Sequence, residues 1–329
     1  MKKTGKFLFA VICLIIAIAI NPILCGEAAG EKLYLGGFAA GFVIETRGAD
    51  VIGLSDVITK DGVKSPSKDA GIEVGDVIMS INGAEINNAK DIGKSLSGNK
   101  GTLTVEISRK GEKLLKPVIP VKDVNGNIKI GVFVRDELNG IGTITYMKSD
   151  LQFAALGHPV LDENGNFLNV SGGKVYRCSV VGVVKGERGK PGELQGLFIE
   201  DELFGTISKN TDVGLYGKMV KKSQLKGMKQ IETGEAEVGK ASIYTCIDGL
   251  EGKEYSISIV KIDKNNGENK NLVIKVTDVE LLKKTNGILQ GMSGSPIVQN
   301  GKLIGAVTHV FVNDPSRGFG ILIDKMLAG

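Results

Sequence analysis

The sequence contains no tryptophan, and its 329 residues include only two histidines, four cysteines and eight prolines. The cysteines show no CxxC or Cys–His spacing, so we expect no metal site and no cofactor. No Arg-rich run occurs, and the net charge of +4 comes from interspersed Lys and Glu, which argues against a nucleic-acid partner. Cys178 and Cys246 alone could pair in an exported domain, and their spacing does not decide it.

Glycine is abundant, with 46 residues, and 42% of the chain is hydrophobic. Short apolar stretches separated by glycine turns predict a mainly β protein, with few helical patterns. The length indicates two domains in addition to any targeting segment.

The N-terminus has the pattern of an export signal. Lys2, Lys3 and Lys6 precede an uncharged run over residues 7–20. A basic flank before an apolar run places the following residues on the extracytoplasmic side. We expect residues 1–29 to form a signal-anchor in the membrane, although Gly26-Glu27-Ala28 would also suit cleavage.

Residues 30–122 read as a peptide-binding module. The stretch SPSKDAGIEVGDVIMSINGAEINN, residues 65–88, resembles a PDZ domain in its order of short helix, Gly-Asp turn, strand and Asn-Gly corner. Upstream, Ala40, Gly41 and Phe42 resemble the loop whose backbone N–H groups hold a peptide's terminal carboxylate. A bound peptide would then add as a strand beside residues 42–44. The other possibility is that this module only packs on its neighbour.

Residues 123–329 follow a polar, turn-prone segment and form a second β-rich domain. Many short strands without βαβ alternation favour a barrel or a sandwich. His158 lies between Gly157 and Pro159, a turn position rather than the apolar face of an element.

The segment GMSGSP, residues 291–296, places Ser293 between glycines, where a hydroxyl can be exposed beside free backbone N–H groups. Ser295 is the weaker nucleophile candidate because Pro296 follows it. A catalytic serine needs a base within hydrogen-bond reach and a carboxylate that orients the base. His158 is the candidate base, and His309, in an alternating strand, reads as structural.

Spacing alone does not identify the acid. Asp278 ends a strand upstream of Ser293, and the alternatives left open are Asp162, Asp201, Asp212, Asp248 and Asp314.

An apolar N-terminus, a PDZ module, ALGH in mid-chain and GMSGSPIVQNGKLIGAVTHVFVNDP near the end resemble, in that order, the stage IV sporulation protein B family of signalling peptidases. The resemblance implies a chymotrypsin-like β-barrel after the PDZ domain, with His158 as base, Asp278 as acid and Ser293 as nucleophile. The N–H groups of Gly291 and Ser293 would form the oxyanion hole. Pro159 departs from the family pattern, in which a glycine is expected.

The resemblance further implies an enzyme at the inner forespore membrane that cleaves itself and a regulatory subunit of an intramembrane metalloprotease complex, leading to sigma-K activation. The competing interpretation is a non-catalytic scaffold that combines a PDZ module with a protease-like fold. A quality-control protease of the HtrA type is disfavoured because its PDZ domain follows the protease domain.

Overall fold

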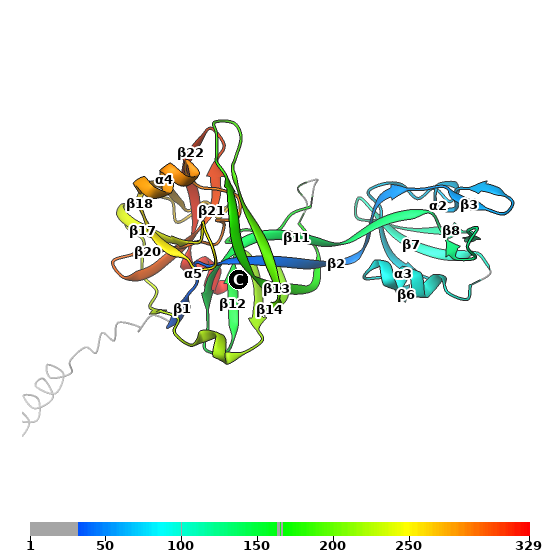
Figure 1. Ribbon diagram of the computed structural model, residues 1–329, viewed down its shortest axis with the longest axis horizontal. Coiled ribbons are helices and arrows are strands. Elements are labelled where there is room, and N and C mark those ends of the chain that lie inside the picture. The colour runs from blue at the N-terminus through cyan, green and yellow to red at the C-terminus, as the bar shows by residue number, and fades with distance from the viewer. Residues whose placement is uncertain (1–31, 100, 163–164, 166) are drawn as a thin grey trace, which may run out of the picture. The chain divides into compact units, whose positions relative to one another are not determined.

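The computed structural model describes residues 32–99, 101–162, 165 and 167–329. The predicted signal-anchor, residues 1–29, lies outside these residues. Within the described part of the chain, no helix is long and apolar enough to cross a membrane. The predicted mainly β fold is confirmed, with a PDZ domain and a peptidase domain built on barrels (Figure 1).

Six strands pair in a ring that forms the first barrel, because β2 pairs with β11 as well as with β13. Apolar side chains that alternate along these strands fill the ring, among them Phe42, Phe153 and Phe204. In order around the ring the strands are β2 (Ala39–Leu54), β11 (Val132–Met147), β12 (Gln152–Ala155), β15 (Gly214–Met219), β14 (Glu193–Thr211) and β13 (Val170–Val184). At the edge of β11 lie β1 (Leu33–Leu35) and β16 (Gln230–Ile231), the latter after the 3₁₀ turn Lys222–Leu225.

The second barrel is a closed ring of six antiparallel strands around its own apolar cluster. Its strands, in ring order, are β17 (Gly239–Thr245), β18 (Lys253–Ile262), β19 (Leu272–Val276), β22 (Asp314–Leu322), β21 (Lys302–Phe311) and β20 (Pro296–Gln299). Helix α4 (Val279–Thr285) follows β19, and α5 (Ile323–Ala328) follows β22. Cys178 and Cys246 are both buried in this cluster as free thiols.

The PDZ domain is inserted into the first barrel between β2 and β11. The first half of β2 pairs with barrel strands, whereas Ala49 and Asp50 pair with β5 (Val77–Ile81) of the PDZ sheet. Strand β11 returns beside β2, from Val132 opposite Leu54 to Thr143 opposite Ala39 (Figure 1). The chain therefore enters the first barrel before it builds the PDZ domain, and residues 33–45 pair with barrel strands.

The PDZ sheet has the strand order β2, β5, β7 (Leu103–Arg109) and β8 (Glu112–Val118). Its buried core includes Ile78, Ile81, Val105 and Ile107. The domain's further elements are β3 (Val57–Thr59), β4 (Gly62–Lys64), α2 (Pro66–Asp69), β6 (Ala84–Glu85), α3 (Ala89–Leu96), β9 (Val121–Lys122) and β10 (Ile128–Lys129). The side chain of Asn88 accepts a hydrogen bond from the Asp91 N–H and so caps α3.

Candidate active site

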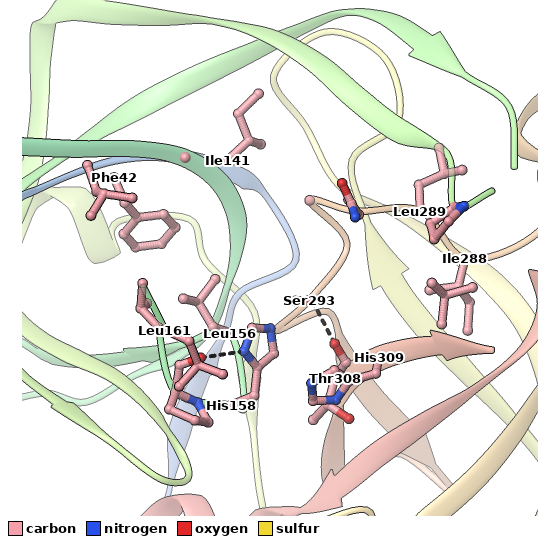
Figure 2. A pocket seen from close by; sticks show the side chains of 18 of the residues that line it. Phe42, Ile141, Leu156, His158, Leu161, Ile288, Leu289, Ser293, Thr308 and His309 are labelled. Carbon is pink, nitrogen blue, oxygen red and sulfur yellow. Dashed lines mark hydrogen bonds between the residues drawn. The ribbon is translucent and has the colours of Figure 1, made fainter. Parts of the chain in front are cut away.

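Ser293 and His158 line one cleft of about 550 Å³, together with side chains from the cores of both barrels. His158 follows β12 of the first barrel, and Ser293 precedes β20 of the second barrel. Figure 2 shows Ser293 between the His158 side and the Ile288 side of this cleft. The structure thus brings together two residues that lie far apart in the sequence and that the sequence predicted as base and nucleophile.

The turn that carries Ser293 is fixed to β11 by backbone and side-chain hydrogen bonds. The Thr143 N–H donates to the Ser293 carbonyl at 2.9 Å, and the Thr143 hydroxyl donates to the Gly291 carbonyl at 3.0 Å. The Thr145 hydroxyl donates to the Gly294 carbonyl at 2.8 Å. These bonds orient the turn so that the Ser293 side chain faces the cleft.

Two backbone N–H groups of the same turn are available for an oxyanion. Among the described residues, neither the Gly291 N–H nor the Ser293 N–H donates to a protein acceptor. Gly291 has φ +95°, a conformation that favours glycine. Unpaired N–H groups beside a nucleophile are what an oxyanion hole requires.

Ser295 is fully buried, and its hydroxyl has no partner among the described residues. A substrate cannot reach it. The choice of Ser293 over Ser295 made from the sequence is therefore supported by their exposure.

A tight turn at residues 155–157 orients His158. Leu156 has φ +70° and Gly157 has φ +72°, and the Gly157 N–H donates to the Ala155 carbonyl, which closes a γ-turn over Leu156. A leucine at positive φ stores strain that packing must offset, and such strain is concentrated at functional sites. The buried Leu156 side chain packs in the first-barrel core.

The ring of His158 is held by its own neighbour. Its Nδ1 lies 2.8 Å from the Pro159 carbonyl oxygen. Because a carbonyl only accepts, Nδ1 carries the proton, and Nε2 is left as an acceptor for a serine hydroxyl. Burial lowers the pKa of His158 below its ordinary value of 6.5, more than the bond to Pro159 raises it. The imidazole is therefore neutral at pH 7.

His309 also lies in this cleft, from β21, with its ring centroid 4.7 Å from that of His158 (Figure 2). Burial away from water, and to a smaller extent the neighbouring His158, lowers the pKa of His309 to about 4. A base this weak takes up a proton poorly at neutral pH. His158 remains the candidate base because the Pro159 carbonyl holds its Nδ1–H and leaves its Nε2 as an acceptor.

In the free protein the Ser293 hydroxyl donates to the Thr308 carbonyl at 2.7 Å. The hydroxyl must leave that acceptor to bond with His158. Hydrogen bonds between catalytic groups are often long or absent without substrate and form in the complex.

The Asp278 carboxylate forms its hydrogen bonds with backbone N–H groups and not with either histidine in the described residues. Its carboxylate accepts hydrogen bonds from the Leu281 N–H at 3.0 Å and the Ser256 N–H at 3.3 Å, and so caps helix α4. None of the six aspartates considered from the sequence lines the cleft in the described part of the chain. Asp278 as the acid therefore stays a prediction, and in this structure its carboxylate is used to cap the start of helix α4.

Ala40, Gly41 and Phe42 do not form the predicted carboxylate-binding loop. They lie in β2, paired with β11 on one edge and with β13 on the other, so their backbone groups are used within the barrel. Gly41 is required because the ring of Phe198 covers the position that a Cβ would take. Phe42 instead lines the cleft beside Ser293.

The PDZ domain has a groove elsewhere, of about 520 Å³, between α3 and the first residues of β11. Residues 132–135 of β11 pair with β2 on one edge, and no other described strand pairs with them. The ring of Phe133 is 59% exposed there. The missed signal was Ile130-Gly131-Val132-Phe133, an apolar run with a glycine that leads into the start of β11.

A model of the SpoIVB peptidase S55 family matches residues 126–327, and a PDZ domain model matches residues 48–118. The chain belongs to the SpoIVB peptidase S55 family. This membership confirms the resemblance seen in the sequence and identifies a serine peptidase with a PDZ domain on its N-terminal side. No curated protein matches the chain. Among the described residues, no cluster of His, Cys, Asp or Glu could hold a metal ion.

Proposed function

We propose that this S55 peptidase cleaves peptide bonds with Ser293 as nucleophile and His158 as general base, without a carboxylate partner. The observation that carries the proposal is the bond from His158 Nδ1–H to the Pro159 carbonyl, which sets the tautomer and leaves Nε2 free. In triads of the chymotrypsin type an aspartate does this work. Here a backbone carbonyl orients the ring.

In the first half of the reaction, the Ser293 oxygen attacks the substrate carbonyl while its proton passes to His158 Nε2. The tetrahedral oxyanion faces the N–H groups of Gly291 and Ser293. When this intermediate collapses, the C–N bond breaks and the leaving amine takes the proton from His158. An acyl-enzyme ester on Ser293 remains.

In the second half, water attacks the ester while His158 accepts its proton; the ester C–O bond then breaks, the Ser293 oxygen takes that proton from His158, and the acid product leaves. A carbonyl stabilises an imidazolium less than a carboxylate does, since it carries no full charge. We therefore expect a slow peptidase that depends on substrate binding to align its groups, which suits a signalling cleavage.

The proposed setting follows from family membership and the N-terminal sequence. The protein is anchored by residues 1–29 at the inner forespore membrane, with its catalytic domain extracytoplasmic. It cleaves itself and a regulatory subunit of an intramembrane metalloprotease complex, and this triggers sigma-K activation. The groove between α3 and β11 binds an extended peptide from the chain itself or from that regulator, as PDZ domains do.

Active-site labelling tests the nucleophile. The purified chain should react covalently with a fluorophosphonate, and mass spectrometry should find the adduct on Ser293. Ser293→Ala should abolish the reaction, whereas Ser295→Ala should retain the label if it folds. An adduct on any other residue, or labelling that survives Ser293→Ala, overturns the assignment.

Self-cleavage is tested by incubating the wild type and Ser293→Ala side by side and identifying fragments by mass spectrometry. Fragments from the wild type alone support autoproteolysis. An intact wild type that also fails to label would favour the non-catalytic scaffold.

A further inference from the structure

The cleft around Ser293 is walled by hydrocarbon on both sides. On the second-barrel side, Ile288, Leu289 and Val310 belong to or pack on the core of that barrel. On the first-barrel side, Phe42 and Leu156 belong to the other core. Figure 2 shows Ile288 and Leu289 across Ser293 from Phe42 and Leu156.

No charged carboxylate, lysine or arginine lines this cleft in the described part of the chain. The polar side chains among its lining residues are the following: Asn139, His158, Gln290, Ser293, Thr308 and His309. A charged substrate side chain would lose its hydration here without gaining an ionic partner, whereas an aliphatic or aromatic one would bury apolar area favourably.

One wall of the cleft is an unpaired strand edge in an otherwise closed barrel. Val307 of β21 is bonded to Gly294 and Ser295, and the Val312 carbonyl accepts from the Gly189 N–H. Between these two, no described strand pairs with this edge of β21. Unpaired N–H and C=O groups in a row are a template for an added strand.

The backbone direction along this edge is set by β21 itself. The Thr308 carbonyl faces the cleft, since it accepts the Ser293 hydroxyl, and the His309 carbonyl lies against Gly318 of β22. Strand alternation then turns the N–H and C=O of Val310 toward the cleft. A peptide of about three residues can pair here.

We propose, on the basis of the serine-peptidase function above, that the substrate is an extended peptide segment with a bulky apolar side chain on the residue whose carbonyl is cleaved. That side chain lies against Ile288, Leu289 and Val310, while the segment pairs with the free edge of β21. The backbone N–H of the residue whose carbonyl is cleaved donates a hydrogen bond to the Thr308 carbonyl, in place of the Ser293 hydroxyl. Substrate pairing thus releases the nucleophile toward His158.

The first test needs no variant. The full-length chain is incubated with a proteome-derived peptide library, and cleavage sites are read by mass spectrometry. We expect cleavage after Leu, Ile, Val, Met and Phe to be at least about ten-fold more frequent than cleavage after Asp, Glu, Lys and Arg. Differences of this size are usual for apolar pockets. Equal cleavage after charged residues overturns the substrate class while leaving the peptidase function intact.

The second test introduces a charge into the apolar wall. Val310→Asp should lower kcat/KM for a Leu peptide and raise it for the matched Lys peptide, so that their ratio shifts at least about ten-fold toward Lys. Val260→Asp, on the exposed face of β18 and outside the cleft, is the control and should leave the ratio unchanged. An unchanged ratio in a Val310→Asp protein that still labels with fluorophosphonate contradicts the assignment of this wall.

The third test addresses the strand edge. N-methylation of the Leu peptide at the residue that donates the cleaved carbonyl removes the N–H that would reach Thr308, and cleavage should fall at least about ten-fold. Undiminished cleavage would refute the pairing. If the wild type neither labels nor cleaves any peptide, the proposed function fails, and this inference fails with it.

Discussion

The ring nitrogen Nδ1 of His158 has a carbonyl partner where peptidases of the chymotrypsin type have a carboxylate. The Pro159 carbonyl fixes the tautomer but adds no negative charge beside the ring. Burial is then the larger influence, and it lowers the pKa of His158. These two facts determine how the reaction should respond to pH.

The pH–rate profile is the first prediction. His158 must be neutral to accept the Ser293 proton. Because its pKa lies below 6.5, it becomes protonated at a lower pH than an ordinary histidine does. The acid limb of kcat/KM, which reports the free enzyme, should therefore have its midpoint below 6.5. Steady-state rates on one peptide between pH 4 and 8 measure it. A midpoint at or above 6.5 would mean that a negative charge supports the imidazolium.

Sequence patterns singled out Ser293 and His158 because both depend on local backbone, and the structure places both in one cleft. A serine between glycines, and a histidine between Gly157 and Pro159, are turn positions wherever the chain goes. The acid was different. Asp278 can turn toward a distant histidine or toward the N–H groups of its own helix, and in the structure it caps α4. Only the packed geometry separates these two outcomes.

Among the elements, the turn at residues 291–296 depends on close approach of the backbone of β11. A Cβ on Gly294 would lie 2.1 Å from the Thr143 carbonyl oxygen, and its φ is +91°. Gly301 also has positive φ, +76°, but open space around it. The two glycines therefore separate the effect of backbone strain from the effect of contact.

We predict that Gly294→Ala abolishes fluorophosphonate labelling and destabilises the protein strongly, because β11 must move away from the turn. Gly301→Ala should cost only the strain of positive φ, about 1 kcal/mol, and should label normally. Denaturant unfolding and labelling of both variants measure this. A Gly294→Ala protein that labels at the wild-type rate would refute the tight seating of the turn on β11.

In the PDZ domain, Asp76 of the Gly-Asp turn is a buried carboxylate, 1% exposed, held by Arg109 through two oxygens at 2.6 and 2.8 Å. Burial alone would raise the pKa of Asp76, but the hydrogen bonds from Arg109 and the Glu73 N–H outweigh it and lower the pKa. Arg109 also contacts the Glu73 carboxylate, which is 66% exposed.

Asp76→Asn should therefore destabilise the PDZ domain by about 1–3 kcal/mol, because the buried position loses its charged bonds to Arg109 while Arg109 is partly exposed and keeps Glu73. Glu73→Gln removes an exposed carboxylate from the same arginine and should cost less than about 1 kcal/mol. Urea unfolding of both variants gives the comparison. Equal losses would show that burial of Asp76 does not matter.

At the scale of the whole molecule, the sequence predicted the right kinds of domain but arranged them one after the other. The β content, the PDZ elements at residues 65–88 and the barrel architecture are confirmed. The insertion of the PDZ domain between β2 and β11 was not foreseen. The apolar residues within 39–54 indicate a strand, but they do not say which strands lie on either edge.

That limit explains the error at Ala40–Phe42. A small residue, a glycine and an aromatic residue also suit a carboxylate-binding loop, and only pairing on both edges shows a central barrel strand. The same strand then supplies Phe42 to the cleft. Strand β11 likewise contributes to both sites, since it borders the PDZ groove at Phe133 and supports Ser293 through Thr143.

The central claim, a Ser293–His158 pair without a carboxylate, is tested most directly by kcat/KM on one Leu peptide for four proteins: wild type, Ser293→Ala, His158→Ala and Asp278→Ser. We predict losses of at least about 10³-fold for the first two variants. Asp278→Ser should stay within about threefold of wild type, because serine caps helices as well as aspartate does. A loss in Asp278→Ser as large as that in His158→Ala would contradict the account and restore a three-residue triad.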